Sequence, residues 1–142
     1  MADKMVSVKM ITEDFNLKGE DYAHQKELHL DFTHLQKINS IGLRGFIIFL
    51  KSIPATTQIK YHHCSPLFVH MFNIVDGLLP PHVEIKSLFI PYFCPTCQND
   101  YTFEAQSPFN KASLHEVRQC PDDGAQLELF YSENTFFKFL KA

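Results

Sequence analysis

Hydrophobic and polar residues alternate along several short stretches of the chain, and elsewhere apolar residues recur at helical spacing. Alternation predicts strands over residues 6–10, 28–32 and 59–63, and a longer apolar run predicts a fourth strand over 83–90. Apolar residues three and four positions apart predict two helices, one between the second and third strands and one between the third and fourth. Strands and helices therefore alternate along this part of the chain.

Signals at the ends of the two helices support this assignment. The first helix carries its apolar stripe at four positions: Leu43, Phe46, Ile47 and Leu50. Pro54 ends that helix, because a proline cannot continue it. Ser65 and Pro66 are a cap and a first helical residue for the second helix, and Gly77 supplies the left-handed residue that follows its end.

The order strand, helix, strand, helix, strand is typical of an α/β fold in which helices cover a mixed sheet. Residues 13–25 are polar and lack periodicity, so we expect a loop there with one short element. The pattern changes at Pro91, where turns and cysteines begin. We therefore predict two parts, residues 1–91 and residues 92–142.

The second part reads as a small β segment followed by a helix. Short strand-like pieces cover 101–105, 114–118 and 126–130, and Ser132 is a candidate cap for a last helix. That helix would carry four apolar residues: Phe136, Phe137, Phe139 and Leu140.

Composition narrows the class of protein. The 142 residues, 45% of them hydrophobic, are enough for one core with a small appendage. Four basic and seven acidic residues lie beyond Tyr92, so the net charge of −3 belongs to the C-terminal part. This argues against nucleic acid as a partner, because binding phosphates needs an excess of Lys and Arg. No apolar run approaches a membrane span and no secretory signal is visible, so a cytoplasmic location is expected.

Small and polar residues mark the junction between the second strand and the first helix. Asn39, Ser40 and Gly42 lie there between two apolar stretches. The spacing favours Ser40 as the N-cap, whose hydroxyl accepts a backbone N–H. The same position suits a phosphoacceptor, because a helix N-terminus tolerates added negative charge.

The sequence around this junction resembles a STAS domain, the fold of bacterial anti-sigma-factor antagonists. The resemblance covers roughly residues 5–90 and rests on ELHLDFTHLQKINSIGLRGFIIFLKSIP, QIKYHHC, SPLFVHMFNIVDGLL and HVEIKSLFIP. The chain is also similar to a group in which INSxGxR precedes a CPxC segment. In the family, the pattern Asp-Ser-Ser/Thr-Gly-Leu carries a serine that is phosphorylated by a kinase-like anti-sigma factor. The resemblance therefore implies Ser40 as the phosphoacceptor and an anti-sigma-factor partner of this kind.

Two positions depart from the family pattern, because Asn39 replaces the Asp and Ile41 replaces the second Ser or Thr. The family meets its partner through this helix and the loop before it. The resemblance implies the corresponding binding set here: Asn39, Ser40, Ile41, Arg44, Ile48 and Lys51. Ile48 and Phe49 either belong to such an exposed surface or pack under a neighbouring element, such as the C-terminal Phe-rich helix.

The cysteines after Pro91 have the spacing of a metal site. CPTC at residues 94–97 is a metal-binding knuckle, and CPDDG at 120–124 repeats it with an aspartate in place of the second cysteine. This part therefore resembles a zinc ribbon, with a structural zinc ion held by Cys94, Cys97, Cys120 and Asp123. The alternative fourth ligands are Asp122, His115 and a water molecule, and a site without metal is the remaining alternative.

Other cysteine and histidine chemistry has less support. In thiol–disulfide enzymes a CxxC motif opens a helix that lowers the thiolate pKa, whereas here a turn and a strand are expected after CPTC. Cys64 is expected to be a buried apolar residue. Strand alternation is expected to point His62 and His63 to opposite faces of the sheet.

We therefore predict a non-enzymatic regulatory protein that binds a protein partner through the helix that begins near Ser40. Phosphorylation of Ser40 is its candidate switch. The alternatives are a thiol–disulfide redox protein that uses Cys94 and Cys97, and a nucleic-acid-binding zinc ribbon. No membrane partner is expected.

Overall fold

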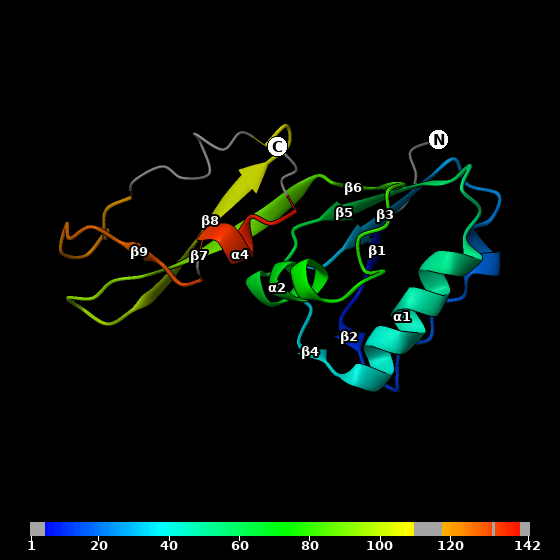
Figure 1. Ribbon diagram of the computed structural model, residues 1–142, viewed down its shortest axis with the longest axis horizontal. Helices are drawn as coiled ribbons and strands as arrows, with labels where there is room; N and C mark the ends of the chain where they lie inside the picture. The colour runs from blue at the N-terminus through cyan, green and yellow to red at the C-terminus, as the bar shows by residue number, and fades with distance from the viewer. Residues whose placement is uncertain (1–4, 110–117, 132, 140–142) are drawn as a thin grey trace.

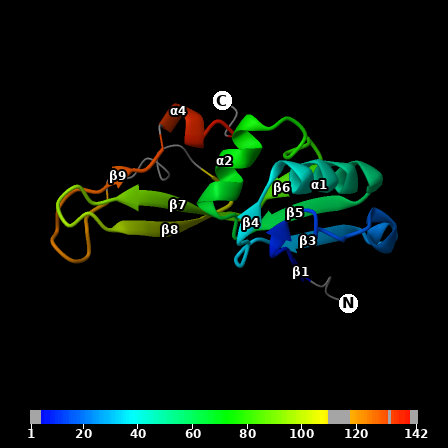
Figure 2. The ribbon, with the colours of Figure 1, turned by 90° about the horizontal axis from the view of Figure 1, so that it is seen from below.

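A four-stranded parallel sheet with two helices on one face forms one end of the molecule (Figures 1 and 2). The computed structural model describes residues 5–109, 118–131 and 133–139. The sheet has the order β1 (Met5–Ser7), β3 (Glu27–Asp31), β5 (Gln58–His62) and β6 (Val83–Ile85). The helices are α1 (Ser40–Ser52) and α2 (Pro66–Ile74). The α/β prediction is confirmed, although this sheet is entirely parallel.

The first predicted strand is broken in two. After β1 the chain leaves the sheet, and β2 (Met10–Ile11) pairs instead with β4 (Lys37–Ile38). The β2 segment therefore contacts the first turn of α1. There Gly42 lies so close to β2 that an added Cβ would be 1.8 Å from the carbonyl oxygen of Ile11. The polar loop that follows holds one short 3₁₀-helix, η1 (Gly19–Tyr22), as expected.

The apolar run over 83–90 also divides between two sheets. β6 ends the parallel sheet, and β7 (Ser87–Phe93) becomes the middle strand of an antiparallel sheet with the order β8-β7-β9. Its partners are β8 (Asp100–Gln106) and β9 (Glu128–Leu129). β7 runs without a break through Pro91, so the antiparallel sheet extends directly from the parallel one (Figure 2).

Part of the C-terminal prediction falls outside the described residues. The expected strand over 114–118 lies there apart from Arg118, and so do the capping residue Ser132 and Leu140. The piece expected over 126–130 is shorter than predicted, because it consists of β9 and a bridge between Gln126 and Gln119. The last helix, α4, spans Glu133–Phe136.

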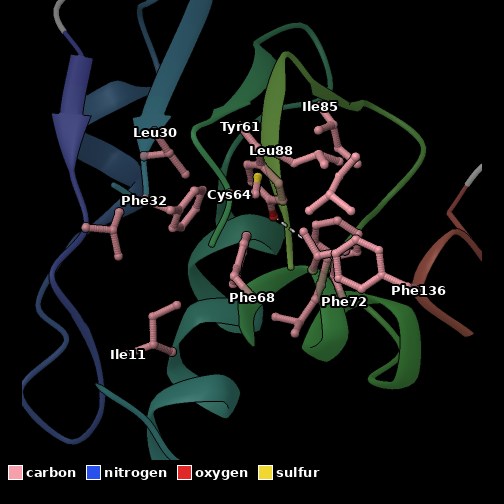
Figure 3. Close-up of a cluster of buried hydrophobic side chains, with 14 of the residues drawn as sticks. Ile11, Leu30, Phe32, Tyr61, Cys64, Phe68, Phe72, Ile85, Leu88 and Phe136 are labelled. Atoms are coloured by element: carbon pink, nitrogen blue, oxygen red, sulfur yellow. Dashed lines mark hydrogen bonds between the residues drawn. The ribbon is translucent and has the colours of Figure 1, made fainter. Parts of the chain in front are cut away.

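The core combines aliphatic and aromatic side chains and joins the two sheets (Figure 3). Phe32 stacks on Phe68 with 4.0 Å between the ring centroids, which fixes α2 against β3. The hydroxyl of Tyr61, which is fully buried, donates to the carbonyl of Leu78 over 2.6 Å. The amide of Asn73 on α2 donates to the carbonyl of Phe136 over 2.7 Å, so α4 packs onto the same core. None of the helices in the described part of the chain has the length and apolarity to span a bilayer.

Candidate metal centre and the exposed face of α1

Two tight turns with the same hydrogen bonds carry three of the four cysteines. In the first turn, the N–H of Gln98 donates to the carbonyl of Cys94 over 2.8 Å. In the second, the N–H of Gly124 donates to the carbonyl of Cys120 over 2.9 Å. Both donors have a left-handed backbone, with φ angles of 62° and 74°. Cys97 precedes the donor in the first turn and Asp123 precedes it in the second. Asp123 therefore has the place in its turn that Cys97 has in the first.

Four side chains converge between these turns. The candidate ligand atoms of Cys94, Cys97, Cys120 and Asp123 all lie within 4.8 Å of one another. The Cys97 and Cys120 sulfurs are 3.7 Å apart, and the Cys94 sulfur lies 3.5 Å from Oδ2 of Asp123. Cys94 and Cys120 are buried, whereas Asp123 is exposed. Three sulfurs and one carboxylate oxygen at these distances could hold a metal ion.

The other predicted fourth ligands are not part of this group. Asp122 accepts a hydrogen bond from the Tyr101 hydroxyl over 2.8 Å and is not among the four converging side chains. His115 lies outside the described residues. The sequence analysis missed Tyr101, whose hydroxyl lies 3.3 Å from the Cys120 sulfur and 3.6 Å from the Cys97 sulfur. The sequence signal that could have identified Tyr101 was its position four residues after Cys97, at the start of an expected strand.

Hydrogen bonds bias the protonation of the cluster. The Tyr101 hydroxyl and a backbone amide lower the pKa of the Cys97 thiol. The amide of Cys97 favours the Cys94 thiolate, but burial and the neighbouring thiols outweigh it and raise the pKa of Cys94 to about 11. The backbone amide of Ala125 lowers the pKa of Asp123. Cys97 and Asp123 are therefore biased toward the ionised form that binds a cation.

The CPTC segment lacks the geometry of a redox motif. In the described structure it forms a turn followed by β8 and opens no helix. The dipole of a helix N-terminus, which lowers a redox thiolate pKa, is therefore missing at Cys94. Cys64 is fully buried and burial raises the pKa of its thiol, so the prediction of an apolar role is confirmed.

Asn39, and not Ser40, caps α1. Its Oδ1 accepts the N–H of Gly42 over 2.8 Å, and its amide nitrogen donates to the carboxylate of Glu13 over 2.9 Å. That hydrogen bond lowers the pKa of Glu13. The capping prediction was wrong by one residue because Asn39 keeps the extended backbone that a cap requires, while Ser40 is already helical. The Ser40 side chain is exposed.

One face of α1 is exposed and partly apolar. Ile41 is 64% exposed and Ile48 is 60% exposed. Arg44 and Lys51 are also exposed, and these four residues follow a helical spacing. Phe49 instead is buried: it packs edge-on against Phe15 and Tyr22 in the segment before β3, not under the C-terminal helix.

The two histidines at the end of β5, His62 and His63, do not point to opposite faces as expected. His63 has a φ of 52°, which breaks the alternation of the strand, and its ring centroid lies 6.3 Å from that of His62. Nδ1 of His63 contacts Asp31 at 3.1 Å, and Nε2 lies 3.5 Å from Glu104 on β8. Histidine adopts this left-handed backbone more often than most residues, but the strand pattern of the sequence does not show that it does so here.

Comparisons of the chain with protein-family models, with curated proteins and with solved structures find no match. Two features of the molecule are candidates for its function. The first is the four-ligand group between the two turns, and the second is the exposed face of α1 that begins at Ser40.

Proposed function

We propose that this chain is a non-enzymatic regulatory module that resembles a STAS domain and binds a protein partner through the exposed face of α1. The observation that carries the proposal is the pair Ile41 and Ile48, which are 64% and 60% exposed on one side of the helix. The two isoleucines are two turns apart on this side of the helix, where both can be buried by one partner surface. They lie beside Arg44 and Lys51, which have no described ion-pair partner.

This combination indicates the chemistry of the partner. Two aliphatic side chains flanked by two cations suit an apolar hollow that is bordered by carboxylates. Ser40 lies at the end of the same face, and its hydroxyl is accessible to a kinase such as an anti-sigma factor. A phosphate there would add roughly two negative charges beside a cationic surface and so change how an acidic partner binds.

The metal of this module is proposed to be a structural zinc ion held by Cys94, Cys97, Cys120 and Asp123. Closed structural zinc sites hold the ion in a tetrahedral group of four protein ligands, and a carboxylate oxygen binds zinc at about the same distance as the histidine nitrogen that often completes a three-cysteine site. The ion would tie the turn between β7 and β8 to the segment that leads into β9, where few other residues are buried. Because all four positions are protein ligands, such a site leaves no open position for catalysis.

A capture experiment with matched variants tests the binding surface. Tagged protein is used to capture partners from the native cells, and Ile48→Lys is compared with Ile74→Lys on α2, where Ile74 is 54% exposed. We expect Ile48→Lys to reduce capture of the specific partner by more than about tenfold, the effect of losing an interface anchor. Ile74→Lys should capture as well as the wild type. Equal capture by Ile48→Lys and the wild type would contradict the proposal.

Two further measurements test phosphorylation of Ser40 and the identity of the metal. The intact mass of protein from native cells should include a phosphate that Ser40→Ala removes, and Ser40→Asp should alter capture of the same partner. Elemental analysis of purified protein should give about one zinc ion more for the wild type than for Cys120→Ser. Zinc-free protein with a mass two hydrogens lower would favour the thiol–disulfide alternative.

A further inference from the structure

The face of the parallel sheet opposite α1 and α2 gathers histidines and carboxylates. Figure 2 shows both helices on one side of β1, β3, β5 and β6. The side chains that alternate to the other side of β3 and β5 are half-buried or exposed except for one buried lysine. The group of interest there is Glu27, His29, Asp31 and His62.

Two imidazole nitrogens on this face meet directly. Nδ1 of His29 lies 2.7 Å from Nε2 of His62, so one nitrogen carries a hydrogen and the other presents a lone pair. Nε2 of His29 lies 3.3 Å from Oε2 of Glu27, which places a hydrogen on that nitrogen. Nδ1 of His29 therefore presents the lone pair. A histidine held through its other nitrogen by a carboxylate is the usual arrangement of a metal ligand.

A carboxylate lies next to this pair. Asp31 is two residues from His29 on the same strand face and is paired in register with His62. Its hydrogen bonds all end on Oδ1, which accepts from Thr33 over 2.6 Å and 3.1 Å and contacts Nδ1 of His63 at 3.1 Å. Among the described residues, no hydrogen bond ends on Oδ2. Oδ2 becomes a third ligand only when the side chain rotates, because Asp31, His29 and His62 do not already converge as the four residues of the cysteine site do.

The charge of the surrounding face favours a cation. Four carboxylates and two lysines lie within this network of contacts: Glu27, Asp31, Glu84, Glu104, Lys60 and Lys86. With neutral histidines the carboxylates are in excess.

We propose that His29 Nδ1 and His62 Nε2, completed by Asp31, bind a second divalent transition-metal ion of the zinc class, separate from the cysteine site. Two nitrogens on one zinc ion lie about 3.3 Å apart, given bonds of about 2.0–2.1 Å. The rings therefore need to separate by only about half an ångström. The ion takes the place of the hydrogen on Nε2 of His62. That proton leaves to solvent while Nδ1 of the same ring takes one up, so the imidazole stays neutral. Glu27 is a positioning residue that orients His29.

Equilibrium dialysis of the full chain against Zn²⁺ at pH 7.5 tests the site. We expect the wild type to bind one ion more than His29→Asn or His62→Gln. His62→Gln keeps an N–H near the original Nε2 position, so a purely structural hydrogen bond to His29 survives while the ligand is lost. Glu27→Gln should lower the affinity for this ion by about tenfold or more, the usual effect of removing a partner of a metal-binding histidine.

The controls separate this site from the proposed cysteine site. His34→Gln changes an exposed histidine outside the group and should bind as many ions as the wild type. Cys120→Ser should lose an ion of its own, so the deficit caused by His62→Gln persists in that background whatever the cysteines bind. Equal zinc content in the wild type, His29→Asn and His62→Gln would overturn the proposal, as would a lost ion in His34→Gln.

Discussion

At the scale of single residues, Gly42 shows how a close approach dictates a side chain. The residue is buried on α1 directly against β2, and its neighbours there are backbone atoms. Backbone atoms cannot turn aside as a flexible side chain can. The glycine of the segment INSIG is therefore required by packing of the fold, whatever the function of the serine before it.

Substitution of this glycine has a matched control in the same helix. Gly42→Ala would put a Cβ 1.8 Å from the carbonyl oxygen of Ile11, so we expect a loss of about 3 kcal/mol in the free energy of unfolding. At Gly45 an added Cβ meets its nearest atom, in Phe15, at 3.9 Å. Gly45→Ala should therefore stabilise the protein by about 0.5–1 kcal/mol. Urea unfolding measures both, and equal effects would contradict this account of the packing.

Asp31 gives a prediction about acid stability. Burial alone would raise the pKa of its carboxyl, but hydrogen bonds from Thr33 and His63 outweigh burial and hold the pKa below its ordinary value of 3.8. A carboxyl with a lowered folded-state pKa stabilises the protein above its unfolded value and loses that effect as pH falls through the folded value. Asp31→Asn should therefore cost most above about pH 4.

Unfolding in urea at several pH values between 6 and 2 measures this loss. The difference between the wild type and Asp31→Asn should shrink as the pH falls below about 4. Asp76→Asn, at an exposed position just after α2, is the control and should show a much smaller difference. A difference for Asp31→Asn that stays constant down to pH 2 would show that these hydrogen bonds do not favour the carboxylate.

At the scale of elements, the start of α1 depends on a residue outside the helix. Asn39 satisfies the N–H of Gly42 and also contacts Glu13 from the preceding loop. One side chain thus caps the helix and fixes the loop that packs over it. Ser40 next to it is free of both tasks, which leaves its hydroxyl for solvent or a partner.

A pair of alanine variants distinguishes these roles. Asn39→Ala removes the cap and should lower the free energy of unfolding by about 1 kcal/mol. Ser40→Ala should change it by less than about 0.5 kcal/mol, the usual range for an exposed position. Denaturant midpoints with an unchanged slope give both values. A larger loss of unfolding free energy for Ser40→Ala than for Asn39→Ala would show that Ser40, and not Asn39, caps the helix.

At the scale of the whole molecule, the two ends depend on different forces. Around α1 and the parallel sheet, buried apolar side chains are continuous. At the far end of β7 and β8, most residues of both turns are exposed, and the few buried residues there include the candidate ligands Cys94 and Cys120. The stability of that end is therefore expected to depend on a bound ion.

Removal of metal should affect these ends unequally. After treatment with a chelator, the amides of Gln98 and Gly124 should lose protection from hydrogen exchange, because their turns are no longer held together. The amides in α1 should keep their protection. Exchange measured by NMR before and after chelation tests this, and uniform loss of protection along the chain would show a single cooperative unit without the proposed division near Pro91.

Much of the fold and half of the site follow from local patterns. The helix at 66–74 with its cap at Ser65 was predicted because the cap, the proline and the apolar spacing are all neighbours in sequence. The group Cys94, Cys97, Cys120 and Asp123 was predicted because a knuckle repeats its own spacing. The STAS resemblance, the partner and the state of Ser40 stay predictions.

What the sequence determined by itself is the order of strands and helices and the residues able to bind a metal, because these depend on short-range periodicity and spacing. Tertiary structure alone decided where the apolar runs at 6–10 and 83–90 break between sheets, since each break is set by a partner strand far away in the chain. It also decided that Phe49 is covered, that Tyr101 reaches the sulfurs and that His29 meets His62. Such meetings depend on segments that no local window of sequence contains.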